Sequence, residues 1–327
     1  MRIVVDAMGG DNAPEAVVRG ALAAARLLVD TEIVLVGQED RIMAELPDGV
    51  PGNLSVVHAP EVIAADEPPA VAVRKKRQSS LSVCYTMVRQ MEGDAVVSAG
   101  STGALLAGGL LLLGRKKGID RPALAVVMPT ARQGTVLLDV GANTDVKPLN
   151  LYQFGVMGSL YAEKVLGRKN PSVGLLNVGQ EDRKGTEVTR QALELLSSLP
   201  GFCGNVEGRD ISGGEVDVIV TDGFTGNVVL KHTEGMAKAL FGMIKEEITR
   251  SFRDKIAALM LRRAFGRVKA RLDYSEYGGA ILLGLDRVSV KCHGSSDAKA
   301  ITNGIFVARK FVESDLVGEL ERYLERP

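Results

Sequence analysis

The sequence of 327 residues has little of several features that define common protein classes. It contains no tryptophan, and aromatic residues make up only 4% of it, which argues against a stacking surface for single-stranded nucleic acid. The 40 basic residues equal the 40 acidic ones, so the net charge is zero and a broadly basic nucleic-acid binder is excluded. The longest apolar run, residues 104–113, has about half the length that a membrane-spanning helix needs.

Metal-binding, disulfide and nucleotide-binding motifs are also missing. The cysteines Cys84, Cys203 and Cys292 are far apart and form no C-x-x-C pair, which favours free thiols in a reducing compartment. No G-x-G-x-x-G follows the first predicted strand, and the chain has no G-x-x-x-x-G-K-[ST], H-E-x-x-H or G-x-S-x-G motif. The first residues show no signal-peptide pattern. We therefore expect a cytoplasmic protein without a metal ion or bound cofactor.

Short apolar runs alternate with helical patterns along the chain. Runs rich in Val, Ile and Leu predict buried strands at residues 2–6, 31–37, 94–98, 124–128, 135–140, 173–177 and 217–221. A capping Asn and an early Pro at residues 12–14 predict a helix that begins there. Further helix signals cover residues 102–113, 148–166, 185–199 and 225–250. The alternation predicts a three-layer α/β/α, Rossmann-like fold with a mainly parallel sheet. We expect one domain over residues 1–327, with a helical excursion at about residues 240–280.

Glycines and small polar residues follow the predicted strands. Ligands of open α/β sheets bind beyond the carboxyl ends of the strands, so we expect five such ends to form one wall. Their backbone N–H groups suit an anion such as phosphate, and a helix that opens at residues 100–103 adds a favourable dipole. For any single loop, a plain capped helix start is the alternative. The candidate phosphate-binding residues are Gly9, Gly10, Asp11, Gly100, Ser101, Thr102, Gly103, Asn143, Asn177 and Gly179.

Three longer side chains are candidates for chemistry at these loops. Lys184 lies between a strand and a helix start, where it either holds an anion or is a solvated surface lysine. Asn227 either caps the helix that follows residues 222–226 or donates to a developing oxyanion. His293, in the sequence KCHGSS, either donates to a phosphate or belongs to a turn.

Residues 250–271 differ in kind from the rest of the chain. They hold eight basic residues and one acidic residue, a net charge of +7, and leave 32 basic and 39 acidic residues elsewhere. A basic segment with an apolar patch favours contact with an anionic membrane surface or an acidic partner. The alternative is a helical pair that packs on a second subunit. The apolar residues of this tip are Ile256, Leu259, Met260, Leu261 and Phe265, along with Phe252.

Several segments together resemble the bacterial phosphate acyltransferase family, and the likeness spans essentially the whole chain. They include MRIVVDAMGGDNAPE, VSAGSTGALLAG, LLDVGANTDVKP, VGLLNVGQEDRKGTE, TDGFTGNVVLK and KCHGSSDAKAI. The resemblance implies conversion of long-chain acyl-carrier protein (acyl-ACP) and inorganic phosphate into acyl phosphate and free ACP, for phospholipid synthesis. Two positions depart from the family pattern: Asn12 stands where His is expected, and Ser101 where Asn is common.

The resemblance carries further expectations. It implies a fold similar to phosphotransacetylases and the isocitrate dehydrogenase class, and a homodimer. It also implies peripheral association with the inner face of the cell membrane through the apolar tip, and a membrane glycerol-3-phosphate acyltransferase as the downstream partner. The implied catalytic residues are Lys184, Asn227, Asp222 and His293. The alternatives are a short-chain phosphotransacetylase and a non-catalytic, membrane-tethered ACP adaptor, with a dehydrogenase third.

Overall fold

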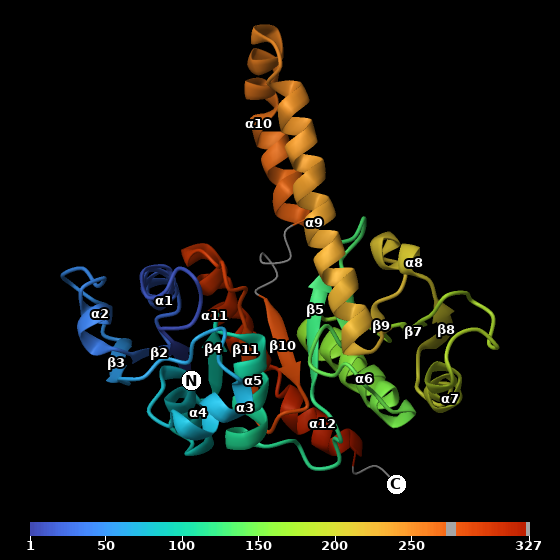
Figure 1. Cartoon of the computed structure of the whole chain (residues 1–327), viewed down its shortest axis with the longest axis horizontal. Helices are drawn as coiled ribbons and strands as arrows, with labels where there is room; N and C mark the ends of the chain where they lie inside the picture. Colours follow the sequence, from blue (N-terminus) through green and yellow to red (C-terminus); the bar gives the residue numbers. More distant parts are fainter. Residues whose placement is uncertain (273–278, 325–327) are drawn as a thin grey trace.

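The computed structural model describes residues 1–272 and 279–324 of the chain (Figure 1). Its strands are β1 (Arg2–Asp6), β2 (Glu32–Gly37), β3 (Leu54–His58), β4 (Ala95–Ser98), β5 (Ala123–Met128), β6 (Thr135–Leu138), β7 (Val173–Leu176), β8 (Phe202–Val206), β9 (Val218–Val220), β10 (Ala280–Leu283) and β11 (Val288–Lys291). Its helices are α1 (Glu15–Leu27), α2 (Glu39–Met43), α3 (Pro69–Lys75), α4 (Ser80–Arg89), α5 (Thr102–Gly108), α6 (Pro148–Leu160), α7 (Glu187–Leu196), α8 (Gly208–Gly213), α9 (Gly223–Ile248), α10 (Phe252–Leu272), α11 (Ala298–Glu313) and α12 (Leu316–Leu324). Helices α5 and α6 each continue into a π-helical turn, over Gly109–Leu113 and Tyr161–Val165.

The strands form one sheet in the order β3-β2-β1-β4-β11-β10-β5-β6-β9-β7-β8. All seven strands predicted from apolar runs are present, as β1, β2, β4, β5, β6, β7 and β9, with ends within two residues of the expected ones. The sequence patterns did not predict β8, β10 and β11. Most neighbouring pairs are parallel, which confirms the predicted mainly parallel sheet.

The sheet consists of two parallel parts that run in opposite directions. Strands β3, β2, β1, β4 and β11 point one way, and β6, β9, β7 and β8 point the other way. The antiparallel pairs β11–β10, β10–β5 and β5–β6 reverse the direction in the middle. The carboxyl ends of the two parts nevertheless lie at similar levels, because Val97 of β4 is in register with Leu138, the last residue of β6, through the strands between them. Residues that follow β4, β6 and β9 line one groove, described below, so the expected wall forms at these three strand ends and leaves out those of β1 and β7.

Helices cover both faces of the sheet and bury an apolar layer on each. On one face, α1, α6, α7, α11 and α12 contribute buried side chains such as Phe154 and Phe311. On the other face, α4, α5 and α9 contribute Tyr85, Leu105 and Leu230. Successive strand residues alternate between the two layers, as the period of two in an extended chain requires. The predicted three-layer α/β/α fold is confirmed.

Helices α9 and α10 leave the sheet together and protrude from it (Figure 1). The carboxylate of Asp222 starts α9 by accepting the N–H of Thr225 at 2.8 Å. At the start of α10, the Ser251 hydroxyl accepts the N–H of Asp254, and the Asp254 carboxylate accepts the N–H of Ser251, both at 3.2 Å. This reciprocal pair is a capping box, which fixes where the second helix begins. The two helices confirm the predicted protruding tip.

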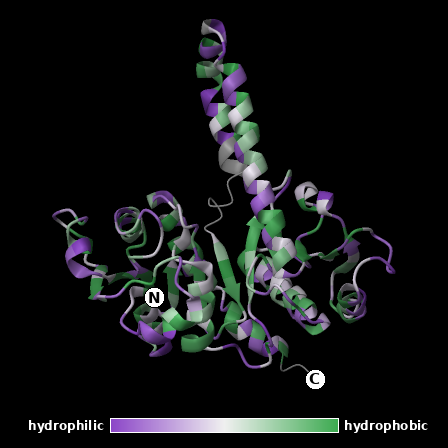
Figure 2. Ribbon diagram, in the orientation of Figure 1, coloured by the Kyte–Doolittle hydropathy of each residue, from purple (hydrophilic) through white to green (hydrophobic). Residues whose placement is uncertain are grey.

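The helical pair exposes apolar side chains. Figure 2 shows apolar and polar residues mixed along both helices. Met260 is 82% exposed and Leu259 is 68% exposed; Ile256 and Leu261 are also exposed, whereas Phe265 is half-buried. In residues 1–272 and 279–324, no helix combines the length and the apolar content needed to cross a membrane.

Candidate functional site

One groove joins an apolar floor to polar side chains, on the sheet face that α5 and α9 cover. Strands β5, β10 and β11 supply the floor, and α9 supplies one wall. Its volume is about 290 Å³, near the lower end of the range for ligand pockets. Within the described ranges, no cluster of three or more His, Cys, Asp or Glu is placed to hold a metal ion. The groove is lined by Thr102, Leu124, Val126, Val140, Gly141, Asn227, Leu230, Lys231, Ala280, Lys291, Cys292 and His293.

A buried carboxylate joins the loops that follow β1 and β4. Asp6 is 3% exposed, and its carboxylate accepts the Ser98 hydroxyl at 2.6 Å and the N–H of Met8 at 3.2 Å. The Ser98 oxygen accepts the N–H of Gly100 at 3.0 Å, so this amide is already bonded within the protein. Burial raises the pKa of Asp6. A Cβ atom on Gly9 would lie 2.5 Å from the Asp6 carboxylate and 2.7 Å from the Gly100 nitrogen, so glycine alone permits this approach.

The loop after β11 meets the same two loops. The N–H of Asp11 donates to the carbonyl of Gly294 at 2.8 Å. Gly10 has a φ of +102°, and a Cβ atom there would lie 2.9 Å from the Cβ of Ala99. The predicted residues Gly9, Gly10, Asp11 and Gly100 therefore lie together, next to the segment that carries His293.

Helix α5 opens at the edge of the groove. Thr102 lines the groove, Ser101 makes no side-chain capping bond, and Gly103 packs against α3. The hydroxyl of Tyr85, a fully buried residue of α4, donates to the carbonyl of Leu105 at 2.9 Å. This bond holds α5 over the sheet, so the position of Thr102 is fixed by the core beneath it.

Asp139 organises the loop after β6. The residue is fully buried, and its carboxylate accepts the N–H groups of Leu124 (3.0 Å), Gly141 (3.2 Å), Ala142 (3.0 Å) and Asn143 (2.6 Å). Burial raises the pKa of Asp139. The Asn143 side-chain nitrogen donates to Asp139 at 2.9 Å and, at 2.8 Å, to the carbonyl that precedes β5. Both hydrogens of this predicted phosphate ligand are thus used inside the protein.

The start of α9 separates the roles of Asp222 and Asn227. Asp222 is the capping residue: its carboxylate accepts the N–H of Thr225 at 2.8 Å and the Thr225 hydroxyl at 2.7 Å. The interpretation of Asn227 as a helix cap is therefore wrong. Asn227 lies inside the helix, one turn further on, with an exposed side chain that lines the groove. Its amide makes no hydrogen bond to any residue that the structure describes.

The loop after β7 forms a separate cluster. The Asn177 side chain donates to the carbonyl of Lys184 and to the side-chain oxygen of Asn205, both at 3.1 Å. Gly179 lies against Lys184, since a Cβ atom there would be 3.3 Å from the lysine Cγ. The side chain of Lys184 is exposed and does not line the groove. The structure therefore places Lys184, Asn177 and Gly179 together, and none of the three lines the groove of Asn227 and His293.

His293 is oriented by its own loop. Its Nδ1 accepts the N–H of Ser295 at 3.1 Å and lies 2.7 Å from the Ser295 hydroxyl. Because a backbone N–H can only donate, the neutral ring carries its proton on Nε2. Burial, followed by the charge of Lys231, lowers the pKa of His293. The ring is thus a neutral Nε2 donor at neutral pH.

Lys291 is a groove residue that the sequence reasoning missed. It ends β11 and is only 9% exposed. Burial lowers its pKa to about 8. A lysine as the last residue of a buried apolar strand was the available signal, because lysine is almost never fully buried unless it is paired.

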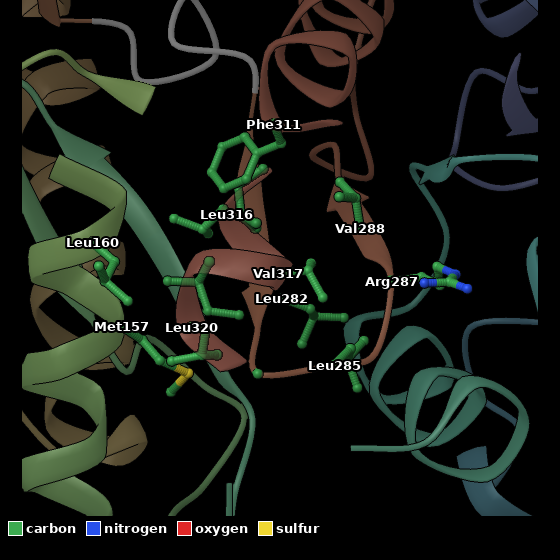
Figure 3. A pocket seen from close by; sticks show the side chains of 13 residues that line it. Met157, Leu160, Leu282, Leu285, Arg287, Val288, Phe311, Leu316, Val317 and Leu320 are labelled. Atoms are coloured by element: carbon green, nitrogen blue, oxygen red, sulfur yellow. The ribbon is translucent and has the colours of Figure 1, made fainter. Parts of the chain in front are cut away.

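A second cavity, on the other face of the sheet, has no comparable polar groups. It lies between the β10–β11 hairpin and helices α6, α11 and α12, and apolar side chains such as Met157, Phe311 and Leu320 line it (Figure 3). Arg287 is its one charged lining residue, and its guanidinium points away from the cavity (Figure 3). The volume is about 20 Å³, which is room for about one water molecule. This cavity is a packing gap in the core.

Comparison with known proteins adds a family relationship. A family model described as "Fatty acid synthesis protein" matches residues 1–318. A phosphate acyltransferase of Desulfitobacterium hafniense is 52% identical, over 100% of this chain and 98% of its own length. Another, of Pelotomaculum thermopropionicum, is 54% identical over 99% of this chain and 95% of its own. A phosphotransacetylase structure from Streptococcus pyogenes shares the fold, with a TM-score of 0.63 at 18% identity over 96% of this chain and 94% of its own.

Proposed function

Because this chain belongs to the phosphate acyltransferase family, we propose that it transfers a long-chain acyl group from acyl-ACP to inorganic phosphate. The observation that carries the proposal is the identity of about half of all residues with phosphate acyltransferases over the full chain. A phosphate oxygen attacks the thioester carbonyl carbon, a C–O bond forms and the C–S bond breaks. The proton of hydrogen phosphate passes to the departing thiolate, which gives acyl phosphate and ACP with a free thiol. The product then supplies a membrane glycerol-3-phosphate acyltransferase.

The groove supports this chemistry without a nucleophilic side chain, because phosphate is itself the nucleophile. The enzyme has to orient phosphate and stabilise an oxyanion. The amide of Asn227, which makes no hydrogen bond to the described residues, is available to polarise the thioester carbonyl. The apolar floor at Leu124 and Val126 suits the first methylene groups of the acyl chain. His293 either contributes to phosphate binding or donates a hydrogen bond through Nε2 to the departing thiolate, which takes its proton from hydrogen phosphate.

The proposal is tested with purified protein, palmitoyl-ACP and phosphate. We expect loss of the thioester that requires phosphate and releases one ACP thiol per acyl phosphate formed. Acetyl-CoA is the matched short-chain donor, and equal or better turnover with it would favour a phosphotransacetylase. Absence of turnover with both donors would leave the ACP adaptor as the better interpretation.

Lys184 is also proposed to contribute to phosphate binding, from the loop after β7 and outside the groove lining that includes Thr102 and Asn227. We expect Lys184→Ala to lower kcat/KM for phosphate at least about tenfold, because hydrogen bonds to charged groups contribute roughly 1.5–3 kcal/mol. The side chain is exposed, so the melting temperature is expected to stay unchanged. Lys169→Ala, an exposed lysine before β7, is the control. Equal values of kcat/KM for phosphate in the two variants would show that Lys184 does not bind phosphate.

The helical pair supports peripheral binding to the inner face of the cell membrane. Exposed apolar residues of α10 alternate with the exposed basic residues Arg253, Lys255, Arg262, Arg263 and Arg267. Such a surface favours anionic lipid headgroups. Between α9 and α10 runs an apolar groove of about 400 Å³, and Leu259 and Phe265 contribute to its lining. Met260 lies outside that lining, which leaves it free to contact lipid.

We propose a homodimer as well.

Replacing Met260 tests the membrane proposal. Met260→Glu removes an 82% exposed apolar side chain and adds a charge that anionic lipids repel. We expect co-sedimentation with phosphatidylglycerol vesicles to fall about tenfold, since burial of such a side chain contributes about 1.5–3 kcal/mol. Activity on acyl-ACP in solution is expected to persist. Val29→Glu, at an 81% exposed position after α1, is the matched control. If the Met260 variant binds vesicles like the control, α10 does not contact lipid.

A further inference from the structure

Lys291 is a buried cation that lines the groove. Its ammonium donates to the carbonyl of Ala99 at 3.4 Å and to the carbonyl of Cys292. In residues 1–272 and 279–324, no Asp or Glu side chain forms an ion pair with it. An ammonium has three N–H donors, and the two carbonyls use two of them. One donor is left for a ligand.

Two other lysines, the equally buried Lys116 and the exposed Lys231, both have carboxylate partners. Lys116 is also 9% exposed, and its ammonium lies 2.7 Å from a Glu321 carboxylate oxygen and 3.6 Å from one of Asp286. Lys231, which lines the groove with Lys291, pairs with Glu234 at 2.8 Å. Withdrawing an ammonium from water is costly unless a counter-charge compensates it. None of the twelve groove residues is a carboxylate, so the missing counter-charge has to come with the ligand.

The charges around Lys291 come from three elements. The pKa of Lys291 is lowered to about 8; burial has the largest effect, and the charge of Lys231 on α9 acts in the same direction. Cys292, next in the chain, Asp11 in the loop after β1 and Asp6 at the end of β1 raise the pKa. Lys291 is therefore mainly a cation at neutral pH and loses its charge as the pH rises through 8. A bound anion would favour the charged form.

We propose that Lys291 binds the phosphate nucleophile in the groove, through the N–H donor that the protein leaves unused. This inference rests on the proposed function and places the phosphate within it. Lys291 pairs in register with Ser98 of β4 and Ala280 of β10, so its ammonium lies between the loop after β4 and the apolar floor. Asn227 lines the same groove. Phosphate on Lys291 therefore shares one space with the carbonyl that Asn227 polarises.

The direct test is the shift in melting temperature that inorganic phosphate produces without any acyl donor. A ligand that binds the folded state raises the melting temperature. We expect the wild-type shift to vanish in Lys291→Met, and the KM for phosphate to rise at least tenfold while the KM for palmitoyl-ACP changes less than threefold. Lys291→Gln keeps a donor for the two carbonyls without the charge, so it serves if the Met variant fails to fold, and the same losses are expected.

Lys116→Met is the matched control for removing an equally buried lysine. It is expected to lower the melting temperature itself but to keep the phosphate-induced shift and the KM for phosphate. If Lys291→Gln keeps the wild-type melting-temperature shift and the wild-type KM for phosphate, the proposal is overturned while the acyltransferase function stands. A shift that depends on Lys291 in a protein without turnover would instead support phosphate binding and reject the proposed function. If phosphate does not shift the melting temperature of the wild type, the KM for phosphate of the Lys291 variants alone tests the proposal.

Discussion

Asn227→Ala is expected to lower kcat for phosphate-dependent cleavage of palmitoyl-ACP by roughly 100- to 1000-fold, the usual effect of removing one oxyanion donor. The amide lies one turn inside α9, whose start is fixed by the Asp222 cap. It is therefore held in place before the substrate arrives. Because the side chain is exposed and makes no hydrogen bond to the described residues, its loss should leave stability within about 0.5 kcal/mol.

The measurement is the steady-state release of ACP thiol at saturating phosphate. Val228→Ala is the control, since this neighbouring residue of α9 is 52% exposed and does not line the groove. Asn227→Asp should be as damaging as the alanine variant, because a carboxylate accepts hydrogen bonds and repels an oxyanion. A kcat near the wild-type value in the alanine variant would show that another group polarises the carbonyl.

Asp139→Ala is expected to reduce the free energy of unfolding by about 3 kcal/mol or more. The carboxylate accepts four backbone N–H groups and the Asn143 amide. Each buried donor left without an acceptor costs roughly 1–3 kcal/mol. The groove residues Val140 and Gly141 belong to this loop, so activity should fall together with stability.

Urea unfolding followed by circular dichroism measures this loss. Asp145→Ala, in the same loop but exposed, is expected to change stability by less than about 0.5 kcal/mol. Asp139→Asn keeps the size of the side chain but replaces one acceptor oxygen by a donor, so it should recover only part of the stability. A loss below about 1 kcal/mol in Asp139→Ala would mean that water or a rearranged loop satisfies the freed N–H groups.

The positions of the strands were predictable from the sequence, whereas their directions were not recognised. Continuous Val, Ile and Leu runs marked seven strands, but β8 (FCGNV) contains Cys, Gly and Asn instead of such a run. Residues 129–134 between β5 and β6, and 284–287 between β10 and β11, are hairpin-length connections. A parallel crossover needs about a dozen residues or more. The connection between β5 and β6, both predicted as strands, was therefore the available signal for the reversal; β10 and β11 were not predicted, so their connection could not serve.

The site was predictable where a polar residue follows a strand and unpredictable where burial decides the role. Thr102, Asn227 and His293 were found because loops at strand ends carry ligand-binding groups. Lys291 was missed because its burial and its lack of a carboxylate depend on neighbours from distant segments. Asp6 ends a strand and Asp139 follows one, so both lie where ligand-binding residues were sought. Their role as hydrogen-bond acceptors for neighbouring loops required the three-dimensional structure.

The continuous helix α9 sets a distance between two parts of the protein. Asn227 lies in the groove near its start, and Ile248 ends it at the far side of the protruding pair. At a rise of about 1.5 Å per residue, the two are up to about 30 Å apart. This is about the thickness of the hydrocarbon core of a bilayer. An acyl phosphate made beside Asn227 thus forms well outside the lipid, even when the far end of α9 touches it. Under the proposed membrane contact, the apolar chain of the product has to cover this distance to reach the bilayer.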